Sequence, residues 1–156
     1  MVATGGSGGA DARIMVLRAV DRAAGTLQFF TDSRAGKVAV IGDDSRVAVL
    51  GWDPARQLQV RLRGVACLAM ADATAAAWAT VPAHAHAAYR TSAAPGSVSS
   101  SPDLAAAFEA SCAVIENFAV IIVTTLEVEL LDLATHPHRR AVFAAADGWA
   151  GTWQTP

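Results

Sequence analysis

Residues 31–37 combine anion-binding side chains with a local structure that favours an anion. The segment follows the apolar pattern of a strand at 27–31. Asp32 or Ser33 is a good N-cap, so the spacing predicts a helix over 34–41, whose first turn offers unpaired N–H groups and the positive end of its dipole. Five side chains could surround a phosphate here: Thr31, Ser33, Arg34 and Lys37 from the segment, and Arg13 from the neighbouring strand. A plain helix cap flanked by surface cations would have the same residues, and that alternative stays open.

A second polar pattern alternates along residues 58–64. On a strand, Gln59, Arg61 and Arg63 lie on one face, and the leucine and valine residues between them lie on the other. A row of amide and guanidinium donors could hydrogen-bond a flat heteroaromatic ring. A solvated sheet face would show the same pattern, so the residues alone leave both interpretations open.

The elements that position these side chains are mostly short antiparallel strands. Apolar runs between turn residues predict strands, and an alanine-rich stretch broken by Pro82 predicts helices. The expected strands are 2–4, 13–20, 27–31, 47–52, 58–70, 118–133, 139–145 and 149–154, and the expected helices are 34–41, 72–89 and 104–110. Hairpins with few helices favour a mainly β fold, a small barrel, over a doubly wound sheet.

The composition limits the possible classes of protein. The chain has 156 residues, 53% hydrophobic and 17% charged, which predicts one folded domain over 1–156. A net charge of −2 argues against nucleic-acid binding. The densest apolar run, 118–123, is too short to span a bilayer, and the glycine-rich start has no signal-peptide pattern. Because Cys67 and Cys112 lie far apart, they suit a reducing compartment, and we expect a soluble cytoplasmic protein.

Two histidine pairs, His84/His86 and His136/His138, have the spacing that places both rings on one face of a strand. No carboxylate or thiolate accompanies them at ligand spacing, so we expect polar loop histidines and no metal site. Neither cysteine has a flanking base, which argues against a nucleophilic cysteine.

Several segments follow one another in the order found in one family. Residues 13–18 are similar to its Arg-x-Val-Leu-Lys/Arg strand, 30–37 to its Phe/Tyr-Thr-x-x-Ser-Arg segment, and 59–64 to its Gln-x-Arg-x-x-Gly strand; 116–120, 137–140 and 149–156 resemble the tail of a shorter subgroup. The chain thus resembles the pyridoxamine 5'-phosphate oxidase-like FMN-binding split-barrel family along almost its whole length. Residues 2–4 resemble the end of the first barrel strand, and the resemblance thus implies that the helix and strand residues that usually precede them are missing from this sequence.

The resemblance implies a six- to seven-stranded antiparallel split barrel that forms a homodimer, with FMN at the subunit interface. The implied cofactor-binding residues are Arg13, Thr31, Ser33, Arg34 and Lys37 at the phosphate; Met15, Val16, Leu17, Gln59 and Arg61 at the ring; and Arg18 and Arg140, the latter from the other subunit. Arg18 and His138 would also line the pocket for an anionic small-molecule substrate. No residue is implied as a catalytic acid or base.

The chain departs from the family at the positions that bind vitamin B6 phosphate. The family's Tyr/Arg/Ser set corresponds here to Trp78, Pro82 and His86, its Arg-x-His pair retains only His138, and Leu130 replaces a tryptophan. We therefore expect an FMN-dependent oxidoreductase that acts on a different small molecule. The alternatives are a non-catalytic protein that binds flavin or haem, and a barrel that only dimerises.

Overall fold

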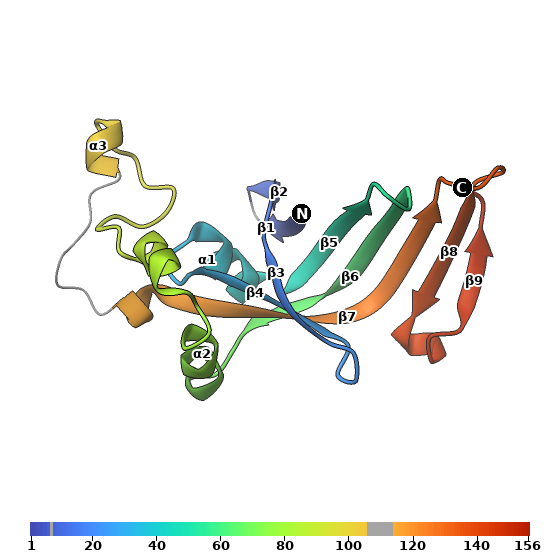
Figure 1. Ribbon diagram of the computed structural model, residues 1–156, viewed down its shortest axis with the longest axis horizontal. Coiled ribbons are helices and arrows are strands. Elements are labelled where there is room, and N and C mark those ends of the chain that lie inside the picture. Colours follow the sequence, from blue (N-terminus) through green and yellow to red (C-terminus); the bar gives the residue numbers. More distant parts are fainter. Residues whose placement is uncertain (7, 106–113) are drawn as a thin grey trace.

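The computed structural model describes residues 1–6, 8–105 and 114–156, and this part of the chain forms one antiparallel sheet of nine strands with short helices (Figure 1). The strands are β1 Val2–Gly6, β2 Gly9–Arg13, β3 Leu17–Asp21, β4 Thr26–Asp32, β5 Arg46–Asp53, β6 Leu58–Leu68, β7 Phe118–Asp132, β8 Arg139–Ala144 and β9 Gly151–Gln154. The α-helices are α1 Gly36–Asp43, α2 Ala71–Trp78 and α3 Pro102–Ala105, and 3-10 helices cover Ala83–Tyr89, Val114–Asn117 and Ala145–Asp147.

Seven strands follow one path, in the order β2-β1-β5-β6-β7-β4-β3. The two edge strands of this path, β2 and β3, are joined by only the three residues 14–16. Three residues cannot bridge the width of a flat seven-stranded sheet, so the sheet must curl until its edges approach each other. The predicted mainly β, antiparallel fold is therefore confirmed, although strand β2 was not among the predicted strands.

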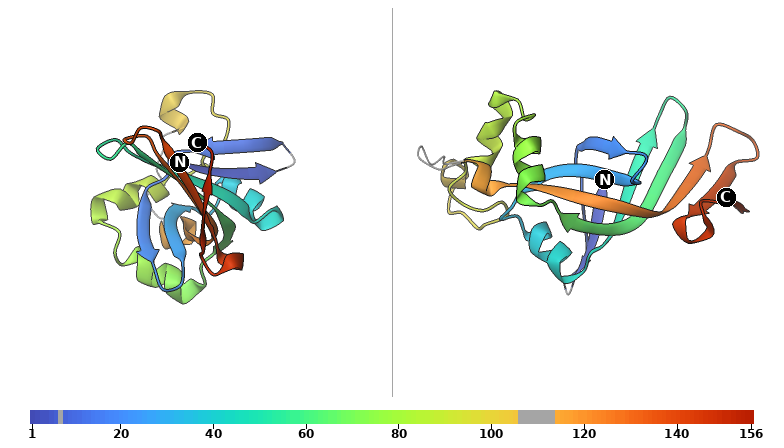
Figure 2. Two further views of the ribbon diagram at one scale, coloured as in Figure 1. Left: turned by 90° about the vertical axis from the view of Figure 1, so that its right-hand side faces the viewer. Right: turned by 90° about the horizontal axis from the view of Figure 1, so that it is seen from below.

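Strand β7 joins the barrel to a projecting hairpin. It pairs with β4 and β6 along its first half and with β6 and β8 along its second. Its apolar first half supplies Val120, Ile121 and Val123, the three largest fully buried side chains. The β8–β9 hairpin extends from its second half, at the end of the molecule opposite to α2 (Figure 2).

The core lies inside the barrel and comes from every strand of the path except the edges. Its buried members are Val2, Leu27, Phe29, Ile41, Val47, Val49, Ala66, Ile121 and Val123, and Met15 and Leu62 pack against them. Only Ile41 comes from a helix, α1, which packs against β1 and β6.

Two predicted elements need correction. The strand predicted over 13–20 is interrupted at 14–16, where the chain passes from one sheet edge to the other, so Ile14 and Val16 are exposed. The helix predicted over 34–41 begins at Gly36, without a side-chain cap. The Asp32 carboxylate instead accepts the Arg34 N–H at 2.8 Å, which forms a turn ahead of the helix.

Helix α2 is fixed against the barrel by an aromatic cluster. Trp78 stacks on His86 with ring centroids 4.0 Å apart and contacts Phe118, at the start of β7, at 5.0 Å. Tyr89 contacts both Trp78 and Phe118, and burial raises the pKa of its phenol. The cluster thereby holds the helical segment that the sequence predicted over 72–89.

The β-bulge between Arg63 and Gly64 requires glycine. A Cβ at Gly64 would lie 2.1 Å from the Thr124 carbonyl oxygen, which is part of the adjacent backbone of β7. We expect Gly64→Ala to lower the free energy of unfolding by about 3 kcal/mol, the upper end of the usual cost of overpacking, because the strands must separate. Gly51→Ala is the matched control, since its Cβ would meet nothing closer than 3.9 Å. Equal urea midpoints for the two variants would contradict this account of the bulge.

Most of the helix predicted over 104–110, and Cys112, lie outside the described residues. Cys67 is exposed on β6. Within the described part of the chain, no helix is long and apolar enough to cross a membrane.

Candidate functional site

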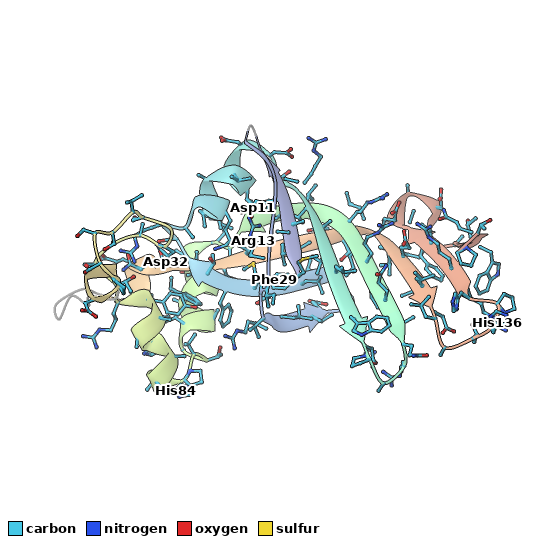
Figure 3. The ribbon with its side chains drawn as sticks, turned by 90° about the horizontal axis from the view of Figure 1, so that it is seen from above. Asp11, Arg13, Phe29, Asp32, His84 and His136 are labelled. Carbon is cyan, nitrogen blue, oxygen red and sulfur yellow. The ribbon has the colours of Figure 1, made fainter. Side chains whose placement is uncertain are left out.

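Two cations and two threonines meet at the junction of β1, β2, β4 and α1. Lys37 Nζ donates to Thr31 Oγ1 at 3.1 Å, and Arg13 Nη1 donates to Thr4 Oγ1 at 3.0 Å. Both threonines are buried. The exposed Asp11 carboxylate pairs with the Arg13 guanidinium beside it (Figure 3). We call Arg13, Thr31 and Lys37 the cation cradle.

The electrostatics of the cradle favour an anion. Burial lowers the pKa of Lys37, and the neighbouring charge of Arg13 lowers it further. Two cations that are close together and partly buried repel each other, and an anion bound between them offsets this repulsion. Gly36 and Lys37 begin α1, so their N–H groups have no acceptor within the helix. The cradle therefore has the charge and donors that a phosphate monoester needs.

Ser33 and Arg34, predicted to hold the same phosphate, are directed elsewhere. Ser33 Oγ donates to the Glu116 carbonyl oxygen at 3.0 Å. Arg34 forms an ion pair with the buried Asp32 at 2.8 Å and donates to the Thr91 carbonyl oxygen at 3.0 Å. These bonds tie the end of β4 to residues 91 and 116. Their role at the phosphate stays a prediction.

We expect Arg34→Ala to lower the free energy of unfolding by about 3 kcal/mol, because it leaves the Asp32 carboxylate buried without its cation. Arg46→Ala is the control: Arg46 pairs with Asp44 on the surface, where solvent screens the attraction between the two charges. Denaturant unfolding of both variants measures the difference. A loss for Arg34→Ala no larger than that for Arg46→Ala would show that this ion pair does not stabilise the fold.

The sheet brings Arg61 and Arg140 together on one buried carboxylate. Glu129, on β7, is 5% exposed and lies between its register partner Arg61 on β6 and Arg140 on β8. Arg61 pairs with Glu129, and Arg140 donates to it at 2.9 Å. Desolvation raises the pKa of this carboxyl, but the hydrogen bonds from Arg140 and Arg61 outweigh it and hold the pKa below its usual value. The cluster carries a net positive charge and two buried Nε atoms without a partner.

The register places this cluster and the cradle on opposite faces of the sheet. Arg13 is opposite Val2, Val2 is opposite Val49, and Val49 is opposite Leu62, so these four side chains share the core-facing side. Arg61 precedes Leu62 and faces the other way, as does Gln59. The structure therefore does not join all the predicted FMN residues into one site within a subunit.

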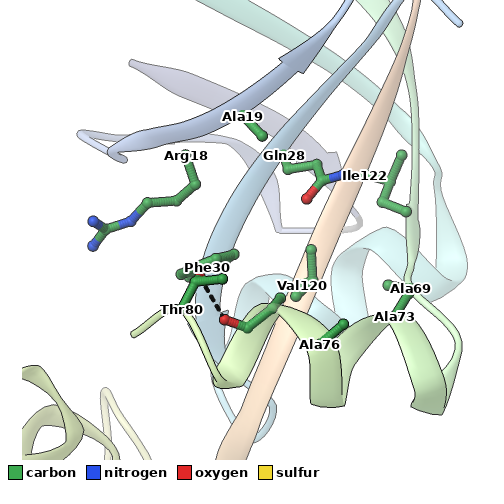
Figure 4. A pocket seen from close by; sticks show the side chains of 11 residues that line it. Arg18, Ala19, Gln28, Phe30, Ala69, Ala73, Ala76, Thr80, Val120 and Ile122 are labelled. Atoms are coloured by element: carbon green, nitrogen blue, oxygen red, sulfur yellow. Dashed lines mark hydrogen bonds between the residues drawn. The ribbon is translucent and has the colours of Figure 1, made fainter. Parts of the chain in front are cut away.

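Residues 15–18 run from the core to a cavity beside α2. Met15 packs against the core, while Val16 and Leu17 are 60% and 48% exposed. Arg18 lines a cavity of about 550 Å³ between the β3–β4–β7 surface and α2 (Figure 4). A smaller hollow continues from it to Pro82.

The histidines do not join these clusters. His138 lies in the turn between β7 and β8, where its ring nitrogen is 3.0 Å from the Thr135 carbonyl oxygen. Figure 3 shows His136, of the same turn, at the far end from Asp32 and His84. Arg18 lines a cavity beside α2, at the end of the molecule opposite to the β8–β9 hairpin, so one subunit does not bring His138 to Arg18. In the part of the chain that the structure describes, no three potential metal ligands lie close together.

Sequence reasoning missed Thr4, Gln28, Asp32 and Glu129 as site residues. The sequence identifies Asp32 only as a candidate helix cap. The signal that could have found Glu129 is its acidic alternation with Glu127, on a strand that must pair with the Arg61/Arg63 strand.

No protein-family model and no curated protein sequence matches the chain. Solved structures do. A pyridoxamine 5'-phosphate oxidase-related, FMN-binding protein from Nostoc punctiforme superposes with a TM-score of 0.85, over 99% of this chain and 86% of that one, at 21% identity. PhzG from Burkholderia lata, in complex with tetrahydrophenazine-1-carboxylic acid, gives 0.82 over 99% and 80%, at 17% identity. A heme-binding protein from Mycobacterium smegmatis gives 0.54 over 93% and 52%, at 17% identity.

These superpositions agree with the observed strand order and with the sequence resemblance. At such low identity they establish the architecture of the chain. The protein has the split-barrel fold of the pyridoxamine 5'-phosphate oxidase-related proteins.

Proposed function

We propose that the protein binds FMN, with the cofactor's phosphate in the cation cradle. The observation that supports this proposal is the position of Arg13 and Lys37 beside the buried hydroxyls of Thr4 and Thr31, where burial and then the nearby charge of Arg13 lower the pKa of Lys37. A phosphate accepts from such donors and neutralises both cations. The fold supports the proposal, because the superposed protein from Nostoc punctiforme is described as FMN binding.

Different residues of the chain would bind the phosphate and the ring of the cofactor. The cradle would hold the phosphate, and Gln59 and Arg61 would meet the polar edge of the ring. When bound, FMN supplies a two-electron acceptor, so the protein contributes binding, orientation and electrostatics. The exposed Asp11 carboxylate is a stand-in for the phosphate on Arg13, and its exposure lets it turn away when the cofactor enters.

We also propose that the complete site forms between two copies of the chain. The cradle and the Arg61–Glu129–Arg140 cluster face opposite sides of one subunit, so a partner must supply one of them. Large apolar side chains are exposed, among them Ile14 at 90% and Trp153 at 73%. Ile14, Val16 and Leu17 form an exposed apolar stretch, and contiguous exposed apolar surface is typical of an interface. Sedimentation at several concentrations should give the mass of a dimer, and a monomer at micromolar concentration would contradict this part of the proposal.

The proposal is tested by a visible absorption spectrum of the purified protein, followed by acid release and chromatography of the chromophore. An oxidised flavin spectrum with released FMN is the expected result. A haem-like spectrum would favour the alternative that the heme-binding structure of the same fold suggests. A colourless protein that takes up no added FMN would contradict FMN binding.

We propose that the flavoprotein is an oxidoreductase that acts on a small molecule. NAD(P)H or another donor should then bleach the flavin absorbance, and air should restore it. A bound flavin that no donor reduces would instead identify a non-catalytic binding protein.

A further inference from the structure

Lys37 is the only lysine of the chain, and its amine lies within the cation cradle. The side chain is partly buried, so the fold holds the amine in place and leaves it accessible to small reagents. Its Nζ donates to Oγ1 of the buried Thr31 at 3.1 Å, with the charge of Arg13 nearby. The amine therefore has a fixed position beside a second cation, which an ordinary surface lysine lacks.

The surroundings of Lys37 favour its uncharged form. Burial lowers the pKa of Lys37, and the charge of Arg13 lowers it further, whereas the carboxylates of Asp32 and Asp11 raise it but do not restore the ordinary value. Both carboxylates are paired with arginines, Asp32 with Arg34 and Asp11 with Arg13. The uncharged amine is the nucleophilic form, and lysines are activated in proteins by desolvation or by a neighbouring cation. Lys37 combines both causes of activation.

The same surroundings select the charge of a reagent. The Arg13 guanidinium can bind an anionic group beside the amine, because its partner Asp11 is exposed and can turn away. A reagent suited to this position carries its anionic group next to an electrophilic carbon. Acyl phosphates have this structure, since their phosphate is bonded directly to the acyl carbon.

We propose that Lys37 is a site of acylation by small acyl phosphates, and that this modification regulates the binding of FMN. The phosphate of the reagent pairs with Arg13 while the Nζ lone pair forms a bond to the acyl carbon. The bond from that carbon to the phosphate oxygen breaks, and the phosphate leaves with the electron pair. The proton that the nitrogen loses goes to the departing phosphate, so the products are an amide and hydrogen phosphate.

The modification changes the charge of the cradle. An acylated lysine is uncharged, so Arg13 is left as the one cation of the cradle. The effect on FMN rests on the proposed function, whereas the acylation itself is measured on the flavin-free protein.

An internal reference lysine tests the reactivity of Lys37. Arg22→Lys places a lysine at an exposed position outside the cradle. When this variant is incubated with acetyl phosphate, peptide mapping by mass spectrometry should show Lys37 acetylated at least about tenfold faster than the introduced lysine. The same mapping separates both sites from the amine of Met1. Equal rates at the two lysines would overturn the proposal.

An uncharged acetyl donor, p-nitrophenyl acetate, tests the recognition of the anion. In the Arg22→Lys background, Arg13→Gln should lower the ratio of the Lys37 rates with acetyl phosphate and with the ester at least about tenfold. A change in the pKa of Lys37 affects both rates alike and cancels in the ratio. Arg56→Gln, which removes an exposed cation paired with Asp53, should leave the ratio unchanged. A ratio that Arg13→Gln does not lower would overturn the role of the phosphate in recognition.

The effect on the cofactor is measured by fluorescence titration with FMN before and after acetylation. Acetylation of Lys37 should weaken FMN at least about tenfold, and bound FMN should slow the acetylation. In the Lys37→Arg variant, treatment with acetyl phosphate should change nothing, because the side chain keeps its charge and is not acetylated. A flavoprotein whose Lys37 reacts no faster than the reference lysine overturns only this inference. A protein whose Lys37 reacts selectively but which takes up no FMN overturns only the proposed cofactor.

Discussion

Replacement of both cradle cations, Arg13→Ala with Lys37→Ala, should reduce FMN affinity by at least about a hundredfold. Each lost charge-assisted hydrogen bond contributes about 1.5–3 kcal/mol, and about 1.4 kcal/mol corresponds to a factor of ten. The stability of the apoprotein should change little, because the variant also removes the burial of the Lys37 charge and its repulsion by Arg13, which together lower the pKa of Lys37. Fluorescence titration with FMN gives the affinity, and urea unfolding gives the stability.

Two variants control this experiment. Arg22→Ala with Arg56→Ala removes two exposed cations outside the cradle and should leave the FMN affinity unchanged. Asp11→Asn removes the carboxylate that competes for Arg13, so it should tighten FMN binding. If the cradle variant retained wild-type affinity, the phosphate would lie elsewhere, and the segment around Ser33 and Arg34 would be the next place to test.

Glu129→Gln should lower the free energy of unfolding by about 3 kcal/mol. The substitution keeps the shape of the side chain but leaves Arg61 and Arg140 without their shared anion. Loss of one member of a buried ion pair costs about 3–5 kcal/mol, and the partial exposure of both guanidinium groups places the loss at the lower end. Glu127→Gln is the matched control, because its partner Arg63 is 60% exposed.

The pH dependence of the Glu129 effect has a defined sign. The pKa of Glu129 is lower in the folded protein than its ordinary value of 4.5, because the hydrogen bonds from the two arginines outweigh desolvation. Its stabilisation is therefore complete above about pH 4.5 and is lost as the pH falls through the folded pKa. The difference in stability between wild type and Glu129→Gln should narrow below that pH. A difference that stays constant from pH 7 to pH 3 would assign the effect to packing.

Local patterns in the sequence were sufficient for most of the fold. Alternation and turn residues located β4, β5, β6 and the unusually long β7, because these strands have one face in the core. The interruption at 14–16 could not be predicted in this way. Its residues remain apolar, and the break arises only because the chain must pass between the two edges of a curled sheet.

The sequence was sufficient to predict which residues belong to the candidate site, but it did not show which of their side chains contact one another. Arg13 and Lys37 lie close together, as expected, although Arg13 is on strand β2 and Lys37 is in helix α1. Arg34 was placed with them because it is a neighbour in sequence, yet the buried Asp32 two residues earlier pairs with it. Arg61 and Arg140 are 79 positions apart in the chain. Only the pairing of β6, β7 and β8 reveals that they share Glu129.

The central claim is that the cradle recognises the phosphate of FMN, and a comparison of FMN with riboflavin tests it most directly. The two ligands have the same ring system and differ in the phosphate alone. Titration of the flavin-free protein should give FMN an affinity at least about a hundredfold higher than that of riboflavin, the contribution of two charge-assisted contacts. Equal affinities for the two flavins would show that the cradle contributes nothing to binding and would contradict the account.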